Sequence, residues 1–474
     1  MITLDLIVQA FTGIQIAQTG PMLTEAVIDS RVVIPGALFI ALPGEKSDGH
    51  RFVGAAFEKG AQVALVQQDM PEGMRVLDLR RVNSSSEELS IPEMPFCLRV
   101  DDTLQALQDL ARFWRRKLSL RVVGITGSVG KSSTKELTAE VLARKFHTYR
   151  NPGNYNNEIG LPLTILNLGS GYERLVAEMG FYYPGEITFL CDIAQPEIGV
   201  VTNIGTVHAE RAGSQEAIAK GKSELVQALP AAPEGTAILN YDDPYVRAMA
   251  DQTKANVLFY GLDAAADLWA DEIQGCGLKG IQFRMHYQDK SVRMEVPILG
   301  RHSVQTILRA AAVGFCEGLT WQEVTDGLVH SNTQLRLVAV QTNSGALILD
   351  DTYNATPEST LAALDLLDEL QGQKIAVLGD MLELGQYEKE GHELVGQRAA
   401  QVVQHLIAVG PRGRTIADSA KEVGLPSTAI TWVEDALQAA DVLKYNLQSG
   451  DVVLIKGSHG LRMDRIAAIL EENA

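Results

Sequence analysis

The chain has 474 residues, of which 46% are hydrophobic and 21% charged, and its formal net charge is −18. This length favours about three domains of about 150 residues each, and the acidic balance argues against a nucleic-acid-binding protein. The amino-terminal stretch MITLDLIVQAF carries Asp5 and no basic segment, and no apolar run approaches the roughly 18 residues that span a bilayer. We therefore expect a cytoplasmic protein without membrane insertion.

The four cysteines are widely separated, at Cys97, Cys191, Cys276 and Cys316, and form no CxxC pair. This spacing indicates neither a zinc site nor a disulfide framework. We expect small, buried hydrophobic residues at these positions.

The segment 1–118 mixes short apolar strands, as at 37–42 and 62–66, with turns. The polar stretch at 83–88 predicts a surface loop. Apolar residues then recur at helical spacing over 104–114, and the basic residues that follow favour a helix end. The segment predicts a small amino-terminal α/β domain.

A glycine-rich stretch at 124–132, GITGSVGKS, follows the apolar pair 122–123 and precedes a helix-prone segment at 133–144. Such a turn between strand and helix forms a phosphate cradle, because backbone N–H groups and the helix amino terminus bind phosphate oxygens. The GxxxxGK[ST] motif would need glycine where Ile125 stands, so a turn without ligand is the alternative. The dinucleotide-binding fingerprint GxGxxG fits less well, because a lysine at the position of Lys131 is not part of that motif.

The end of this stretch predicts a nucleoside triphosphate site. Lys131 is suited to reach the terminal phosphates, and Ser132 to ligate the Mg²⁺ that accompanies them. The residues expected to contact the nucleotide are Gly127, Ser128, Gly130, Lys131, Ser132 and Ser133.

The segment 119–327 alternates apolar strands with helical stretches, which predicts a parallel sheet with the cradle at the end of its first strand. Its strands are expected at 122–124, 175–177, 199–201 and 237–239. Two alternating stretches at 281–286 and 292–296, joined by a polar turn at 288–290, predict an antiparallel hairpin.

The segment 328–474 repeats an α/β pattern that predicts a Rossmann-like unit. Its strands are expected at 346–349, 375–378, 406–409 and 452–455. The predicted fold class is therefore α/β with three domains: a small N-terminal α/β domain, a central P-loop parallel-sheet ATPase domain and a C-terminal Rossmann-like domain. Several domains around a nucleotide site are typical of an enzyme that closes on its substrates.

Three further residues are candidate ligands, and each has an ordinary alternative. Glu178 follows an expected strand, where a carboxylate can bind Mg²⁺, but an exposed acid is equally consistent with its position. A lone histidine such as His208 is more often a structural hydrogen-bonding residue. Lys222, in KGKSE, would normally lie on a solvated helix face.

Two expected strand exits carry polar clusters. The stretch 350–357, DDTYNATP, holds two carboxylates, an amide and a phenol, although NATP also makes a good turn. The stretch 456–460, KGSHG, is basic and glycine-rich and would suit an anion, and a plain turn is the alternative.

The order of these motifs resembles that of the Mur ligases over nearly the whole chain. The motifs that carry the resemblance are 124–132, NYNNEIGLP at 154–162, EMG at 178–180, the His208 loop, 350–357, LGDMLELG at 378–385, 456–460, DSR at 29–31, FIALPG at 39–44 and DGH at 48–50.

The resemblance implies an ATP-dependent amide ligase that joins D-alanyl-D-alanine to UDP-N-acetylmuramoyl-tripeptide in peptidoglycan precursor synthesis. The tripeptide carboxylate would attack the γ-phosphate to form an acyl phosphate, and the dipeptide amine would then displace phosphate. Lys131 and two Mg²⁺ ions would neutralise the charge between the two anions.

The resemblance also implies roles for single residues. Ser132 and Glu178 would hold one Mg²⁺, and His208 would help to hold the second. Lys222 would be carbamylated, which turns a cation into a metal-binding carbamate. Lys131, His208 and Lys222 are thus the expected catalytic residues.

The remaining implied contacts belong to substrates. ATP recognition would fall near Asn240, His302, Arg336 and Asp350. The uridine nucleotide would contact Ser30 and Arg31, Asn157 would bind substrate, and the dipeptide would lie near Asp351, Tyr353 and Asn354. A monomer is expected.

The chain departs from the family pattern in three places. The departing residues are Phe181, Tyr182 and Tyr183 after EMG, Ser303 and Thr306 where the family has asparagines, and His459 where it has arginine. They leave open a paralogue that adds a different amino acid or peptide. A catalytically silent nucleotide-binding scaffold is the other alternative, and the third peptide residue, diaminopimelate or lysine, also stays open.

Overall fold

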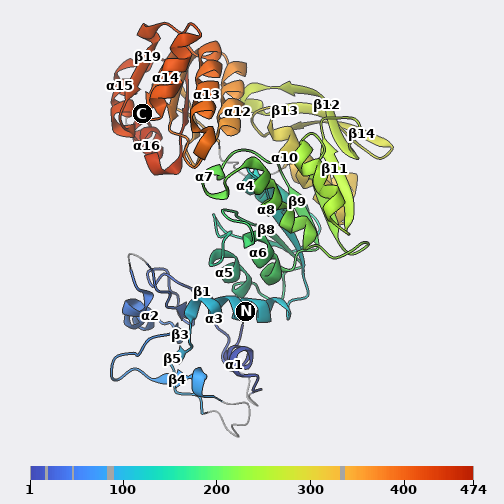
Figure 1. The fold of residues 1–474 in the computed structure, drawn as a ribbon, viewed down its shortest axis with the longest axis vertical. Helices are drawn as coiled ribbons and strands as arrows, with labels where there is room; N and C mark the ends of the chain where they lie inside the picture. Colours follow the sequence, from blue (N-terminus) through green and yellow to red (C-terminus); the bar gives the residue numbers. More distant parts are fainter. Residues whose placement is uncertain (1, 16–19, 45–46, 83–89, 331–336, 473–474) are drawn as a thin grey trace. The chain divides into compact units, whose positions relative to one another are not determined.

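The computed structural model describes residues 2–15, 20–44, 47–82, 90–330 and 337–472, so the loop expected at 83–88 lies outside the described residues. Figure 1 shows the chain as a ribbon coloured from its amino to its carboxyl end. The chain forms two compact units. The first comprises Met1–Gly124, Phe146–Gly180 and Glu186–Glu197, and the second comprises Ile125–Lys145, Phe181–Gly185 and Ile198–Ala474. No helix of the described part is long and apolar enough to cross a membrane.

A five-stranded sheet in the order β1-β2-β3-β5-β4 organises the first unit, and its neighbouring strands pair in parallel. Its strands are β1 (Ala26–Val27), β2 (Leu38–Ile40), β3 (Val63–Val66), β4 (Val76–Asp78) and β5 (Phe96–Arg99). Phe39, Ala64 and Cys97 pair in register across adjacent strands and are completely buried. They pack with Val53 and Ala56 of α2 (Val53–Glu58), which confirms a small α/β core.

The other helices of this unit include the one expected over 104–114. They are α1 (Leu4–Thr12), α3 (Thr103–Arg115), α5 (Gly160–Leu166) and α6 (Glu186–Ala194), and the unit also holds β7 (Thr148–Arg150) and β8 (Arg174–Glu178). The Asp102 carboxylate accepts a hydrogen bond from Gln105 N and so caps α3. At its other end Arg115 is buried and donates to the Ala194 carbonyl at 2.7 Å.

A nine-stranded sheet has the order β14-β13-β12-β11-β10-β9-β6-β8-β7. The strands not yet named are β6 (Arg121–Thr126), β9 (Ile198–Val201), β10 (Thr236–Asn240), β11 (Asn256–Gly261), β12 (Leu268–Gly275), β13 (Ile281–Tyr287) and β14 (Lys290–Val296). Strands β9 to β12 pair in parallel, and β12 to β14 pair antiparallel, as predicted. The hairpin turn is shorter than expected, because Lys290 already pairs with Tyr287 and only Gln288 and Asp289 form the turn.

The helices that accompany these strands in the second unit include the one expected after the glycine-rich loop. They are α4 (Lys131–Leu142), α7 (Ala209–Ala212), α8 (Gln215–Gln227), α9 (Pro244–Arg247), α10 (Ser303–Cys316) and α11 (Trp321–Val329). Helix α10 packs against α4, the helix that opens with Lys131.

A six-stranded sheet in the order β15-β16-β20-β17-β18-β19 completes the second unit. Its strands are β15 (Val338–Gln341), β16 (Leu347–Asp351), β17 (Gln373–Gly379), β18 (His405–Val409), β19 (Ile430–Val433) and β20 (Asp451–Lys456). All neighbouring pairs are parallel except the edge pair β15–β16. The four expected strands are confirmed, whereas β15 and β19 were not predicted.

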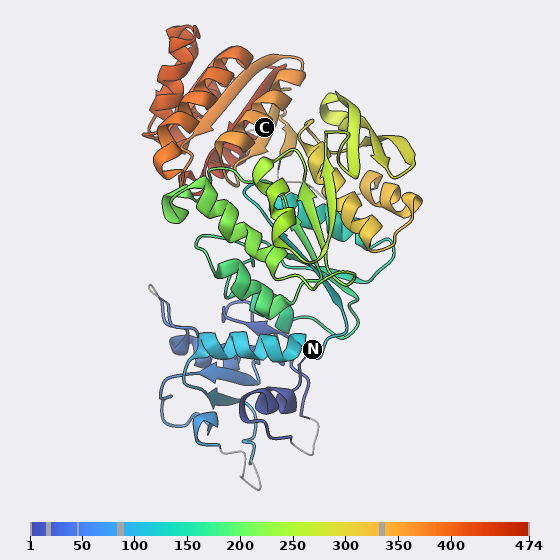
Figure 2. The ribbon, with the colours of Figure 1, turned by 45° about the vertical axis from the view of Figure 1, so that its right-hand side comes forward.

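Helices cover both faces of this sheet, as the Rossmann-like prediction requires (Figure 2). They are α12 (Pro357–Glu369), α13 (Glu388–Val402), α14 (Gly413–Glu422), α15 (Ala436–Asn446) and α16 (Asp464–Glu472). Val452 and Leu454 pack with α12, α13 and α14, while Val453 and Ile455 pack with α15 and α16. This alternation along β20 follows from the two-residue period of a strand.

Candidate active site

The glycine-rich loop joins β6, which ends at Thr126, to α4, which begins at Lys131. Gly127 and Gly130 have φ angles of 143° and 84°, which favour glycine. In addition, neighbouring atoms leave no room for a side chain at Gly127 or Gly130. A Cβ on Gly127 would lie 1.8 Å from Thr202 Oγ1, and one on Gly130 would lie 2.9 Å from Arg309 Nη2. The predicted strand, loop and helix are therefore present, with a geometry that excludes other residues.

The segment after β9 holds this loop in place. The Thr202 hydroxyl donates to the Val129 carbonyl at 2.7 Å, and the Asn203 side chain accepts from Val129 N at 2.9 Å. Gly205 N donates to Ser128 Oγ at 2.9 Å. Thr202 and Asn203 were not predicted as functional residues, and the only signal for them in the sequence is their position at the end of an expected strand.

Two lysines converge on one carbonyl of the loop. Lys131 Nζ donates to the Gly127 carbonyl at 2.8 Å and to the Ser128 carbonyl at 3.2 Å. Lys222 Nζ, which comes from α8, also donates to the Gly127 carbonyl, at 2.9 Å. Lys131, predicted from the loop motif, and Lys222, which belongs to α8, thus lie side by side.

Lys222 is completely buried, so the solvated helix face considered for it is wrong. Its Nζ lies 4.8 Å from the centroid of the Phe181 ring. Burial, together with the neighbouring Lys131 ammonium, lowers the pKa of Lys222 well below its ordinary value. Burial therefore favours the neutral amine, which is the nucleophilic form of this side chain.

His208 lies in the second unit beside a carboxylate that is remote from it in the sequence. Its Nδ1 is 2.6 Å from Oε2 of Glu383, in the loop after β17. Burial lowers the His208 pKa below its ordinary value despite this contact, and the same hydrogen bond lowers the Glu383 pKa. The Tyr182 ring meets His208 edge-on at 4.9 Å, and Arg211 lies over Tyr182 at 4.3 Å.

Glu178 ends β8 in the first unit, and it is only 2% exposed. The Asn156 side-chain amide donates to its Oε1 at 2.9 Å, and the Glu178 backbone N–H donates to Asn151 Oδ1 at 2.9 Å. The exposed acid considered for Glu178 is therefore wrong. An oriented, buried carboxylate is a suitable Mg²⁺ ligand.

The four predicted metal ligands differ in their chemistry. Among the described residues, no group of three or more His, Cys, Asp and Glu side chains could hold a metal ion. The predicted set combines a hydroxyl, a carboxylate, an imidazole and a modified lysine, so such a cluster is not expected. The oxygen donors at Ser132 and Glu178 fit the preference of Mg²⁺ for oxygen ligands.

The residues expected near ATP's adenosine have separate hydrogen-bond roles. Asn240 is 2% exposed and donates to the Thr202 carbonyl at 3.0 Å. His302 immediately precedes α10, and burial lowers its pKa. Asp350 Oδ1 accepts from Thr352 N at 3.0 Å. Arg336 lies outside the described residues.

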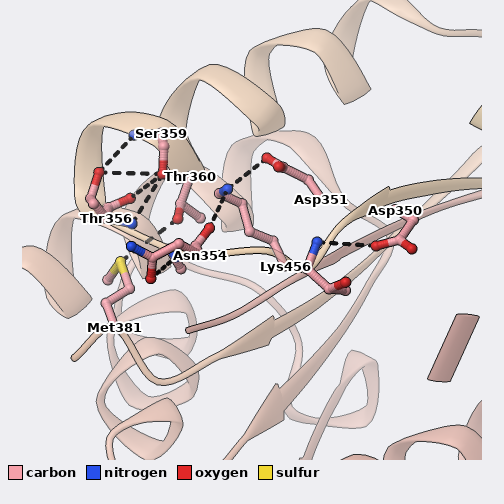
Figure 3. Close-up of polar contacts among 10 residues, drawn as sticks. Asp350, Asp351, Asn354, Thr356, Ser359, Thr360, Met381 and Lys456 are labelled. Carbon is pink, nitrogen blue, oxygen red and sulfur yellow. Dashed lines mark hydrogen bonds and ion pairs between the residues drawn. The ribbon is translucent and has the colours of Figure 1, made fainter. Parts of the chain in front are cut away.

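The residues expected near the dipeptide gather at the carboxyl ends of β16 and β20 (Figure 3). Lys456 is 2% exposed, and its Nζ donates to Asp351 Oδ2 at 2.6 Å and to the Asn354 carbonyl at 2.9 Å. Tyr353 is exposed, and its ring centroid is 6.2 Å from that of His459. The NATP half of the motif also serves the fold, because Thr356 caps α12.

The substrate residues expected in the first unit lie in exposed or partly exposed positions. Arg31 forms a bidentate ion pair with Asp29, and this contact lowers the Asp29 pKa to about 2. Ser30 is half-buried beside it. Asn157 is exposed, and its Oδ1 accepts from Gly160 N at the start of α5.

The strand, the glycine-rich loop and the helix that opens with Lys131 define an α/β protein of the P-loop class. Descriptions of one family match along the chain: "Mur ligase family, catalytic domain" over residues 24–115, "Mur ligase middle domain" over 125–314 and "Mur ligase, glutamate ligase domain" over 335–459. The chain belongs to the Mur ligase family and is accordingly a ligase. The resemblance seen in its motifs is confirmed.

Individual relatives cover nearly the whole chain. The UDP-N-acetylmuramoyl-tripeptide–D-alanyl-D-alanine ligase of Bacillus subtilis (strain 168) is 35% identical over 454 residues, covering 94% of this chain and 92% of the relative. MurF from Acinetobacter baumannii has a TM-score of 0.82 at 28% identity, covering 99% and 98% of the two chains. The MurF ligase from Thermotoga maritima in complex with ADP has a TM-score of 0.78 at 29% identity, covering 94% and 97%.

Proposed function

We propose that this chain joins D-alanyl-D-alanine to UDP-N-acetylmuramoyl-tripeptide at the expense of ATP, in peptidoglycan precursor synthesis. The observation that carries the proposal is the convergence of Lys131 and Lys222 on the Gly127 carbonyl, which puts two lysine side chains, one of them completely buried, at the phosphate loop. The names of the relatives support the substrates, and the solved relative with ADP supports the nucleotide.

In the proposed reaction, an oxygen of the tripeptide carboxylate attacks the γ-phosphorus of ATP, and ADP leaves. The dipeptide amine then attacks the acyl carbon, loses a proton, and phosphate leaves with the carboxylate oxygen. Lys131 lies where it stabilises the negative charge of the transferred phosphoryl group.

Ser132 and Glu178 would hold one Mg²⁺, and His208 with the Lys222 carbamate would hold a second. These ions would supply charge neutralisation between the carboxylate and the triphosphate. The carbamate forms when the neutral Lys222 amine adds to CO₂, which creates a C–N bond and releases a proton to solvent. The lowered pKa of Lys222 supports this step.

The substrate contacts proposed from the family pattern follow the three predicted domains. Residues 1–118 would bind the UDP-sugar through Ser30 and Arg31. Residues 119–327 would bind ATP, with adenosine contacts from Asn240 and His302 and, from the third domain, Arg336 and Asp350. Residues 328–474 would take the dipeptide near Asp351, Tyr353 and Asn354. Asn157 would contact substrate, and the working form would be a cytoplasmic monomer.

The test is phosphate release by the purified chain with ATP and Mg²⁺. Release should require both UDP-N-acetylmuramoyl-tripeptide and D-alanyl-D-alanine, and ¹⁸O from the tripeptide carboxylate should appear in the phosphate. A Lys131→Ala variant should be inactive, and unchanged activity in it would reject the mechanism. No phosphate release by the wild type under these conditions would support the silent-scaffold alternative.

A second candidate is a Mur ligase that uses a different amine donor. The observation that favours it is the position of the departures: Phe181 packs on Lys222, Tyr182 packs on His208, and His459 lies near Tyr353. An amine-donor screen with both the diaminopimelate and the lysine tripeptide decides between the two, because equal turnover of another donor would reject D-alanyl-D-alanine as the specific substrate.

A further inference from the structure

Arg309, in α10, is a buried charged residue that the mechanism above does not use. Its side chain is held by three hydroxyl groups and is only 3% exposed. Nε donates to Thr134 Oγ1 at 2.9 Å, Nη1 to the Tyr260 hydroxyl at 3.3 Å, and Nη2 to Thr306 Oγ1 at 2.7 Å. The guanidinium carbon lies 5.6 Å from the centroid of the Tyr260 ring. All of these partners are neutral.

The guanidinium lacks a counter-charge in the part of the chain that the structure describes. No described carboxylate lies within ion-pair distance of Arg309. Arginine remains protonated at any ordinary pH, so the group is a buried, unbalanced cation. Such a group is unfavourable unless an anion compensates it.

Other positive groups surround the same loop. Arg309 approaches the loop at Gly130, where a Cβ would lie 2.9 Å from Nη2. Its partner Thr134 belongs to the first turn of α4, whose amino terminus carries a partial positive charge. Lys131 contacts the loop at Gly127. The loop is therefore bordered by positive charge that a polyphosphate would balance.

We propose that Arg309 is a positioning residue for nucleotide phosphates, acting from behind Gly130 without touching the ligand. The phosphates supply the missing counter-charge, and the hydrogen bond to Thr134 holds the first turn of α4 in place. Thr306, a departure from the family pattern, serves as an acceptor for this arginine. The inference rests on the nucleotide site proposed above and adds a cation that the loop motif does not contain.

Calorimetric titration of the purified full chain tests this inference with three probes: Mg²⁺–ADP, inorganic tripolyphosphate and adenosine. Arg309→Met should weaken the binding of ADP and of tripolyphosphate by about tenfold and leave adenosine binding unchanged. Arg309→Lys should retain most of the affinity, because it keeps the charge. The melting temperature of ligand-free Arg309→Met should be unchanged or higher, because a buried unbalanced cation is removed.

The matched control is Arg115→Met, which removes another buried arginine, one that donates to backbone carbonyls in the first unit. It should leave ADP binding unchanged. If Arg309→Met does not give folded protein, Arg309→Gln replaces it, since it removes the charge and keeps a donor.

Three results would overturn the inference: an ADP affinity of Arg309→Met within about twofold of the wild type, a loss for ADP without a loss for tripolyphosphate, or equal losses in Arg309→Met and Arg309→Lys. A Lys131→Ala variant distinguishes a wrong inference about Arg309 from a wrong assignment of the nucleotide site. If Lys131→Ala abolishes ADP binding and Arg309→Met does not weaken it, only the arginine inference fails. If neither variant changes ADP binding, the nucleotide site itself is rejected.

Discussion

Two buried lysines, Lys222 at the phosphate loop and Lys456 at the end of β20, show how partners change the chemistry of one side chain. Lys456 donates to the Asp351 carboxylate, so its charge is balanced within the fold. Lys222 donates to a carbonyl beside a second lysine, and no carboxylate of the described residues is within ion-pair distance. A lysine buried with a counter-charge holds two strands together, whereas burial without a counter-charge lowers the pKa and favours the neutral amine.

The largest expected effect concerns Lys222, the lysine without a counter-charge. Lys222→Arg should lower the rate of phosphate release by about a thousandfold or more, because a guanidinium cannot form the proposed carbamate. Added bicarbonate should raise the activity of the wild type and leave the variant unchanged. A Lys222→Arg enzyme that keeps near-normal activity would remove the proposed difference between the two lysines.

The second test removes the carboxylate that balances the charge of Lys456. Asp351→Ala leaves the Lys456 ammonium buried without its carboxylate, and it should lower the free energy of unfolding by about 3 kcal/mol. Urea unfolding measures this loss, and adding Lys456→Met to the same variant should recover most of it. Lys222→Met, which removes a buried amine without a counter-charge, should change the stability much less. Equal losses from Asp351→Ala and Lys222→Met would contradict the comparison.

A pH test extends the comparison to a buried group in the first unit. Burial raises the pKa of Cys97 to about 12, while an unfolded thiol has a pKa of about 8.5. The folded thiol therefore keeps its proton where the unfolded one loses it, so stability falls as the pH rises above about 8.5. Between pH 8 and 9.5 the wild type should lose about 1 kcal/mol more than Cys97→Val, measured by urea unfolding. Parallel pH profiles of the two proteins would show that Cys97 does not contribute.

The smallest expected effect concerns an ion pair that is not buried. The Arg31 side chain is 86% exposed although it lies 2.7 Å from Asp29. Arg31→Ala should leave the free energy of unfolding nearly unchanged, because solvent screens the pair. If Arg31 contacts the uridine nucleotide as proposed, the same variant should weaken UDP-sugar binding in a calorimetric titration. A large loss of stability without a loss of binding would show that Arg31 is structural.

Much of the fold could be predicted from short-range patterns. The loop at 124–132, the helix over 104–114, the hairpin near 281–296 and four strands of the third sheet follow from glycine spacing and apolar periodicity. Strands β15 and β19 were missed, because their burial patterns are mixed and neither forms a run of buried residues. Lys290 was assigned to the turn because it is polar, although its backbone pairs with Tyr287.

The site could be predicted only where a motif fixes it locally. Lys131 follows from the loop, but the burial of Lys222 depends on Phe181 and on the loop carbonyl at Gly127. The contact between His208 and Glu383 joins positions 175 residues apart, and no local pattern indicates it. Arg309 was missed for the same reason: two of its three hydroxyl partners, Thr134 and Tyr260, lie 175 and 49 residues away along the chain.

The position of β20 has a consequence for how the third sheet forms. The strand lies between β16 and β17 at the middle of the sheet, yet it is the last of the described strands along the chain. During synthesis, β16 and β17 therefore emerge with the edges that β20 will later pair still open. Such unpaired edges are sites of off-pathway association. The sheet becomes continuous only when β20 pairs with both strands and Lys456 lies opposite Asp351. The ion pair between these two residues therefore forms at the step that closes the sheet.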